Sequence, residues 1–417
     1  MSYTVESVER IPVEVPFREV PGRNLKAQAN WRFFEIVEVT LDSGHRGYGE
    51  AMLGYWSAGL EDEAVERVIG ANPFERMWDG SLGWALQTAL FDAVGRATGV
   101  PIHRLLGDQV HERTPLAWWC IDMPPADWVH EAELALERGY TDLKVKGRPW
   151  FDIREQIDRL AETVPASFAI DVDFNDTLLD ADRAIPVLRE LDEYPQVQLY
   201  ETPIPQDDVA GNRRIRTETD GEVAQHYGRP APERAICEGA CDGFVVTGTP
   251  DRLVGIGAVA AMADRPLFLQ LVGTGITAAH SLHFGGVLET ATWPAINCHQ
   301  IYADDLLADP ITVEDGFAAV PDEPGLGHAV DRAAIERYRV DEDALMESAD
   351  RLVETTWPDG RTMYCTSLSD DLMDAARDGE LPYFEPGVST RVIKDDGSDW
   401  WAETIERARD GPVVEAG

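Results

Sequence analysis

Lysine is the residue type that this 417-residue chain has least of, relative to what a protein of its length usually carries. Only positions 26, 144, 146 and 394 hold lysine, so arginine supplies 32 of the 36 basic residues. The 76 Asp and Glu residues leave a formal net charge of −40. This excludes a nucleic-acid binder that works through a basic face, because phosphate neutralisation needs clustered Lys and Arg. It argues equally against binding to an anionic membrane surface.

Long apolar runs and paired cysteines are also missing. No stretch of 18 uncharged apolar residues occurs, so we predict no transmembrane helix. The first residues lack a basic start and an apolar run, so we expect no secretory signal. The five cysteines are odd in number and form no C-x-x-C motif, which favours reduced thiols in a cytoplasmic protein.

The acidic residues accompany a composition that can build a core. Apolar residues make up 44% of the chain, with 12 Trp and 13 Phe, so the acidity indicates a charged surface rather than disorder. Such a surface repels itself at low ionic strength, whereas salt near 1 M reduces the screening length to about 3 Å. Our hypothesis is a cytoplasmic protein of a salt-accumulating halophile; the alternative is an ordinary acidic protein.

Hydrophobic periodicity predicts an α/β protein. Residues 3–56 alternate like β-strands, and residues 61–106 have helical spacing. Beyond residue 115, short apolar runs alternate with amphipathic helices, which favours a (β/α)8 TIM-type barrel. An open doubly wound sheet is the alternative, but no G-x-G-x-x-G follows the first strand. The predicted strands are 142–146, 168–173, 197–201, 222–226, 243–247 and 266–271, and the predicted helices are 126–138, 151–164 and 180–192.

We therefore predict three parts. These are an α+β capping domain over residues 1–114, a barrel over 115–330 and a C-terminal extension over 331–417 that packs on the cap or barrel. The extension contains a hairpin signal, with Pro-Asp-Gly between two strand-like runs in 351–365.

Charged residues end three successive predicted strands. Lys144 and Lys146 lie two apart and point to the same side of their strand. Two neighbouring ammonium groups would lower each other's pKa, which suits a lysine base, and arginine could not replace them because it does not deprotonate. Asp173 and Glu201 end the next two strands. Carboxylates facing each other at a barrel mouth indicate a hard divalent cation such as Mg²⁺.

This constellation resembles the mandelate racemase and muconate lactonizing branch of the enolase superfamily over residues 5–340. The resemblance rests on K-x-K at 144–146, on Asp173-Phe-Asn175 and on Glu201-Thr-Pro-Ile-Pro. It implies a capping domain closing over a barrel, with Mg²⁺ held by Asp173 and Glu201. A base, here Lys146, would remove the proton next to a substrate carboxylate and give an enediolate, while Lys144 would tune that base or bind the carboxylate.

Departures from the family pattern narrow these expectations. The third metal ligand of the family is an acid at the end of the fifth strand, where positions 225–227 are Gln, His and Tyr. His226 is our candidate ligand, and an imidazole would favour Mn²⁺ or Zn²⁺ over Mg²⁺. A structural histidine is the alternative.

The second proton-transfer group is also missing. Thr247 and Gln270 stand where other family members carry a base or a histidine. A racemase needs a group on each face of the carbon, so we expect a dehydratase (lyase) or cycloisomerase (isomerase) rather than a racemase or epimerase. His299, on the presumed eighth strand, is the candidate replacement acid, and a core histidine is its alternative.

The expected partner is a small anionic carboxylic acid, sugar acids included. Asn175, Thr247 and Gln270 would contact it from the barrel, and Arg18, Arg23 and Tyr55 from loops of the cap. Solvent-exposed arginines are the alternative for these loops. The resemblance also implies a homo-oligomer.

Two rival functions remain. One is an aldolase-type enzyme that forms a Schiff base on Lys144 or Lys146. The other is a barrel that has lost catalysis and binds a ligand or partner.

The halophile hypothesis predicts that the fold depends on salt. Dialysis from 2 M to 0.05 M KCl should remove most of the far-ultraviolet circular dichroism, because unscreened carboxylates repel one another. Adding the salt back should restore the signal. Full stability in dilute buffer would contradict the hypothesis.

Overall fold

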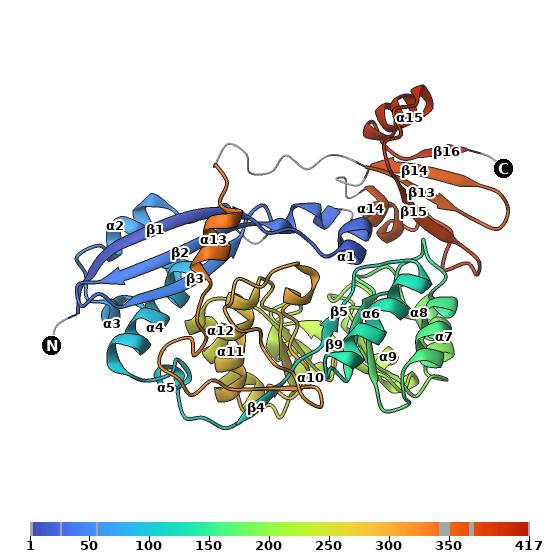
Figure 1. Ribbon diagram of the computed structural model, residues 1–417. Coiled ribbons are helices and arrows are strands. Elements are labelled where there is room, and N and C mark those ends of the chain that lie inside the picture. The colour runs from blue at the N-terminus through green and yellow to red at the C-terminus, as the bar shows by residue number, and fades with distance from the viewer. Residues whose placement is uncertain (1–2, 26, 56, 342–350, 367–370, 416–417) are drawn as a thin grey trace. The chain divides into compact units, whose positions relative to one another are not determined.

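The computed structural model of the protein describes residues 3–25, 27–55, 57–341, 351–366 and 371–415 (Figure 1). Its contacts form two compact units, each assembled from separate segments. The first unit comprises Met1–Arg18, Asn30–Ala117 and Val245–Glu347, and the second comprises Glu19–Ala29, Trp118–Phe244 and Ser348–Gly417. The predicted boundaries at 114/115 and 330/331 stay predictions.

The first unit contains an antiparallel sheet in the order β1-β2-β3 with helix α4 packed against β3 (Figure 1). Two glycines of β3 allow this close approach. A Cβ atom on Gly47 or Gly49 would lie about 2 Å from backbone atoms of α4. The bounds are β1 (Val5–Glu14), β2 (Phe33–Leu41), β3 (Arg46–Met52) and α4 (Trp84–Thr98).

Shorter elements complete the first unit. They are α2 (Asp62–Val68), α3 (Pro73–Arg76), η2 (Gly80–Leu82), α5 (His103–Leu106), β4 (Arg113–Pro115), β11 (Leu267–Leu269), α11 (Pro250–Met262), α12 (Gly275–Val287), η3 (His299–Ile301), β12 (Phe317–Ala319) and α13 (Arg332–Tyr338). The turn η1 (Ala27–Arg32) begins in the second unit and ends in the first.

The second unit holds the parallel strands that the sequence predicts. Pairing runs from β5 through β6, β7 and β8 to β9, all parallel. The strands are β5 (Trp118–Trp119), β6 (Asp142–Lys146), β7 (Ala169–Asp173), β8 (Val197–Glu201) and β9 (Glu222–His226), and the helices are α1 (Glu19–Asn24), α6 (Pro125–Glu137), α7 (Ile153–Thr163), α8 (Ala181–Leu191), α9 (Val209–Glu218) and α10 (Pro232–Glu238).

Some of the abundant acidic residues cap the N-termini of helices in this unit. Asp152, Asp180 and Asp208 stand at the N-caps of α7, α8 and α9, and each side chain accepts hydrogen bonds from backbone N–H groups of the first turn. Such caps stabilise a helix by about 1 kcal/mol each. Each of these helices then returns the chain to the next parallel strand.

Strand β10 (Gly243–Val246) belongs to both units, because the division between them falls inside it. The parallel sheet therefore has seven strands in the order β11-β10-β9-β8-β7-β6-β5. An eighth position is only rudimentary: within the first unit, Ala295 and Ile296 form single parallel bridges to Leu116 and Gln270. The α/β barrel with its separate antiparallel cap sheet is confirmed, and its eighth strand is reduced to these bridges.

The C-terminal segment forms a four-stranded antiparallel sheet in the order β15-β13-β14-β16. The predicted hairpin is confirmed, since β13 and β14 pair from Leu352↔Thr366 to Thr356↔Thr362. We call the described part of this segment, residues 351–366 and 371–415, the C-terminal extension. Its elements are β13 (Leu352–Thr356), β14 (Thr362–Thr366), α14 (Asp371–Arg377), β15 (Ser389–Ile393), α15 (Asp399–Arg409) and β16 (Val413–Glu415).

Two further sequence expectations concern the whole chain. In the part of the chain that the structure describes, every helix is too short or too polar to span a bilayer. All five cysteines lie in described segments, and none of them forms a disulfide.

Candidate active site

The candidate site lies at the carboxyl ends of β6, β7 and β8 in the second unit. Lys146 is paired in register with Asp173, which in turn is paired with Glu201. Lys144 lies two residues before Lys146 on β6. Because alternate residues of a strand share a face, all four side chains project from the same face of the sheet. Three of them are at most 1% exposed, and Lys146 is 9% exposed.

Two ammonium–carboxylate pairs join these residues. Lys146 Nζ donates to Asp173 Oδ2 at 2.5 Å, and Lys144 Nζ donates to Glu201 Oε2. Lys144 Nζ also lies 3.9 Å from Asp173 Oδ2, so its charge stands between the two carboxylates. Buried charges are tolerated only when they are paired in this way.

The two lysines differ in basicity, although the sequence suggested that they would lower each other's pKa. Burial alone would lower the pKa of Lys144, but the carboxylates of Glu201 and Asp173 outweigh it, and the pKa is raised. Burial would raise the pKa of Glu201, yet the charge of Lys144 and the hydrogen bond from His226 hold it below its ordinary value. Lys144 therefore holds its proton more strongly than an ordinary lysine and serves as the counterion of Glu201 and Asp173.

Lys146 is the group whose proton is held weakly. Burial lowers its pKa, and Asp173 offsets this only in part because the charges of Lys144 and Arg148 lower the pKa further. A buried amine with a lowered pKa, partly reachable from solvent, has the properties of a general base.

Sequence reasoning missed a second acidic layer, which lies level with Lys144 and below it. Asp142 and Asp171 are buried on the same strands, and Asp171 is paired in register with Lys144. Burial raises the pKa of Asp171 to about 7 and that of Asp142 well above its ordinary range. The even spacing of Asp142, Lys144 and Lys146 was the available signal for this layer.

Arg148 is a second residue that the sequence did not single out. Its side chain is buried, with Nη1 donating to the carbonyl of Asp173 at 3.0 Å and Nη2 to Asn175 Oδ1 at 2.5 Å. The same Asn175 oxygen accepts from Lys146 Nζ at 3.3 Å. Its position two residues after Lys146 was the only sequence signal.

His226, the proposed third ligand, also reaches this cluster. Its Nε2 lies 3.2 Å from Glu201 Oε1 at the end of β9, and its side chain is 34% exposed. The structure thus brings together six predicted site residues, Lys144, Lys146, Asp173, Asn175, Glu201 and His226.

One predicted residue of the same unit lies elsewhere. Arg23 forms a two-pronged ion pair with Asp127 of α6, with Nη2 2.5 Å from Oδ1 and Nε 3.1 Å from Oδ2. Its guanidinium is thereby used to join α1 to α6. Lys26, three residues after Arg23, lies outside the described residues.

The remaining predicted residues belong to the first unit. Thr247 lines a cavity of about 330 Å³, together with residues such as Glu50, Trp84, Leu271 and Thr277. Gln270 is half-buried and forms the parallel bridge to Ile296. His299 is buried on the turn η3 rather than on a strand.

The cap residues Arg18 and Tyr55 have different surroundings within that unit. Arg18 Nε donates to the carbonyl of Gln300 at 2.5 Å. Tyr55 is 51% exposed, and its ring centroid lies 4.7 Å from that of Trp31.

Comparison with known proteins agrees with this architecture. The family model described as "Enolase C-terminal domain-like" matches residues 127–334. Arabinonate dehydratase of Saccharolobus solfataricus is 24% identical over 73% of this chain and 91% of its own length, and muconate cycloisomerase 1-2 of Acinetobacter lwoffii is 24% identical over 81% and 96%. The crystal structure of muconate lactonizing enzyme from Pseudomonas fluorescens superimposes with a TM-score of 0.68 at 22% identity, covering 82% of this chain and all of that one.

The chain belongs to the enolase superfamily. Its similarity to solved structures lies in the mandelate racemase and muconate lactonizing branch, as the sequence motifs indicated. Enolase-superfamily members generally use Mg²⁺, so the cluster of this member can be tested for that ion.

The donor set fits a hard cation in part. Asp173 and Glu201 are buried oxygen donors, and the ammonium of Lys144 already marks a cation position between them. In the described segments, no three His, Cys, Asp or Glu side chains are arranged to hold a metal ion. Asp173 and Glu201 are therefore the residues that would hold Mg²⁺ in this enolase-superfamily chain, in competition with the lysines.

This competition predicts that Lys144→Met strengthens divalent binding. Removing the ammonium leaves two buried carboxylates undercompensated, which costs about 3–5 kcal/mol in typical proteins and which a bound ion would relieve. We expect 10 mM MgCl2 to raise the melting temperature of Lys144→Met clearly more than that of the wild type at constant ionic strength.

The matched control is Lys394→Met, because Lys394 is exposed. It should respond to Mg²⁺ like the wild type. An equal response of all three proteins would show that Lys144 does not occupy the cation position.

Proposed function

We propose that this protein removes the α-proton of a small carboxylic acid, with Lys146 as the base. The observation that carries the proposal is the unequal lysine pair. One buried amine is held charged by two carboxylates, and its neighbour, two residues away, has a lowered pKa. This division supplies a base and a fixed positive charge side by side.

The fixed charges address the main difficulty of the reaction. An α-proton beside a carboxylate is very weakly acidic, so the enediolate needs strong electrostatic stabilisation. Lys144 and Arg148 supply buried positive charge near Lys146, and Asn175 accepts hydrogen bonds from both Lys146 and Arg148. A divalent cation held by Asp173 and Glu201 would add further positive charge at the substrate carboxylate.

The reaction type that we propose is a one-base elimination or cycloisomerisation. Thr247 and Gln270 supply no titratable group at the ends of their strands, so a second base is not evident there. Relatives include a dehydratase and a cycloisomerase, which fits this class. We propose small organic acids, sugar acids included, as the substrates.

Replacing Lys146 tests the assignment directly. Lys146→Arg keeps a cation but loses the base, because arginine does not deprotonate. Incubation of a panel of carboxylic acids in D2O, followed by NMR, should show exchange or turnover of at least one acid with the wild type. The variant should be slower by about 10²–10⁴-fold, the usual contribution of a general base.

Lys394→Arg is the control for this experiment and should keep wild-type rates. Equal rates for Lys146→Arg and the wild type would contradict the role of Lys146. Trapping of a lysine by borohydride in the presence of substrate would instead favour the Schiff-base rival, and no activity on any acid would favour a binding function.

The lowered pKa of Lys146 predicts the pH dependence of turnover. Only the neutral amine accepts a proton, so the rate should rise tenfold per pH unit while Lys146 is protonated and level off above its pKa. Because that pKa is lowered, the plateau should begin below about pH 10.4, the ordinary value for lysine. A rate that still rises tenfold per unit at pH 10.4 would contradict the shift.

A further inference from the structure

The place and length of the C-terminal extension fit an addition to the fold shared with the relatives. The family match ends at residue 334, and the muconate lactonizing enzyme of Pseudomonas fluorescens is covered completely while about a fifth of this chain has no counterpart in it. The extension belongs to the same compact unit as the candidate site. What it touches in that unit therefore bears on its role.

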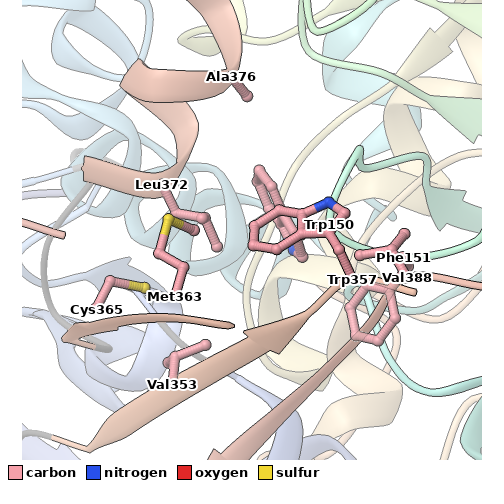
Figure 2. Packing of buried hydrophobic residues seen from close by; sticks show 9 residues of the cluster. All are labelled: Trp150, Phe151, Val353, Trp357, Met363, Cys365, Leu372, Ala376 and Val388. Atoms are coloured by element: carbon pink, nitrogen blue, oxygen red, sulfur yellow. The ribbon is translucent and has the colours of Figure 1, made fainter. Parts of the chain in front are cut away.

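The two faces of the extension's sheet pack against different partners. One face carries Leu352 and Tyr364, which pack with Ile405 and Ala408 of α15. The other face forms a nine-residue cluster, and two of its members, Trp150 and Phe151, come from outside the extension (Figure 2). The others are Val353, Trp357, Met363, Cys365, Leu372, Ala376 and Val388.

Trp150 and Phe151 belong to the loop between β6 and α7, residues 147–152, which we call the β6–α7 loop. This loop directly follows Lys146. Trp150 is 3% exposed, and its indole Nε1 donates to Asp122 Oδ2 at 2.7 Å. Figure 2 shows its ring among the side chains of the extension's cluster.

Hydrogen bonds fix the backbone of the loop to β15 and the segment before it. Thr390 Oγ1 donates to the carbonyl of Trp150 at 2.7 Å. The N–H of Asp152 donates to the carbonyl of Val388 at 3.2 Å, and the N–H of Gly387 donates to Asp152 Oδ2 at 2.8 Å. The loop is thus held on both its apolar and its polar sides.

From Trp150 the contacts continue to the base. The guanidinium carbon of Arg148 lies 5.9 Å from the centre of the Trp150 ring. Arg148 donates to Asn175 Oδ1, and Lys146 donates to the same atom. A displacement of the loop would therefore move Arg148 away from Asn175. Asn175, which accepts a hydrogen bond from Lys146, would then be held less firmly.

The extension also reaches the loop that follows β7. Arg377 Nε donates to the carbonyl of Asn175 at 3.3 Å, and the rings of Phe384 and Phe174 meet edge to face with centroids 6.0 Å apart. Asn175 has a φ of +47°, in the left-handed region that asparagine adopts more readily than most other non-glycine residues. Both loops that carry partners of Lys146 are thus supported by the extension.

We propose that the C-terminal extension is a positioning element of the active site, which holds Lys146 in place through Trp150, Arg148 and Asn175. This inference rests on the proposed function, because it assigns the extension to the base of that reaction. The extension contributes no catalytic residue. Its role is to fix two strand-end loops, because loops are generally more mobile than the strands that they follow.

The test uses Thr390, whose hydroxyl also lies 2.7 Å from that of Thr355. Thr390→Val removes the bond to Trp150 and the bond to Thr355, whereas Thr355→Val removes only the second. Thr390→Ser restores the hydroxyl. The three full-length variants separate the loop contact from a general loss of a buried hydrogen bond in the same sheet.

The readout is acylation of each lysine by an N-hydroxysuccinimide acetate, followed by peptide mass spectrometry. With only four lysines, exposed Lys394 serves as an internal reference. In Thr390→Val we expect Lys146 acylation relative to Lys394 to rise by about tenfold, the effect of one buried hydrogen bond on a local opening equilibrium. Thr355→Val and Thr390→Ser should stay within about twofold of the wild type.

Equal Lys146 protection in Thr390→Val and Thr355→Val, at similar melting temperatures, would overturn the proposal and leave the extension a stabilising addition. If Thr390→Val does not fold, Trp150→Phe replaces it. The smaller phenyl ring fills less of the cluster that Trp150 forms with the extension and also lacks the bond to Asp122, so it should expose Lys146 as well. The acylation readout needs no substrate, so its result is independent of the turnover assay on Lys146→Arg. The positioning role of the extension and the proposed function can therefore fail separately. With a substrate in hand, Thr390→Val should lower kcat several-fold and leave KM unchanged.

Discussion

Two buried ammonium–carboxylate pairs control the chemistry that the second unit can support. Taking four charges out of water is costly, and only mutual pairing makes it tolerable. The pairing is unequal: Lys144 lies between Glu201 and Asp173, whereas Lys146 faces Asp173 alone and two neighbouring cations. One lysine is consequently fixed as a charge and the other is left able to lose its proton. The parallel register of β6, β7 and β8 is what creates this difference.

Strands place these groups, but loops determine how firmly they are held. Lys146 ends β6, and its neighbours Arg148 and Asn175 already lie in the loops beyond the strands. A catalytic group at a strand end needs support from outside the barrel, because a displacement of about 1 Å can cost 10²-fold in rate. In this chain, the C-terminal extension contacts both loops, through Thr390 of β15 and Arg377 of α14. An appended domain can thus affect chemistry without supplying a reacting group.

Much of this could be predicted from the sequence, since it depends on local periodicity. The alternation of Asp142, Lys144 and Lys146 gives the shared face, and acids at the ends of the next strands give the partners. What the sequence could not tell is which carboxylate each ammonium meets, and so the opposite pKa shifts of the two lysines were missed. The packing of the C-terminal extension against Trp150 could not be predicted either, because contacts between residues more than 200 positions apart leave no periodic signal.

The scarcity of lysine can be explained by the different demands on surface and buried cations. Charges on the surface interact through salt water and are screened within about 10 Å or less, whereas buried pairs are screened far less. Repulsion between the acidic surface residues therefore depends on ionic strength. The charges of the lysine cluster depend instead on the groups that are buried beside them. Arginine keeps its positive charge across the ordinary pH range, and surface ion pairs of the described residues, such as Arg10–Asp62 and Arg154–Glu190, use it. Only a lysine can be both a buried cation and, with altered neighbours, a base.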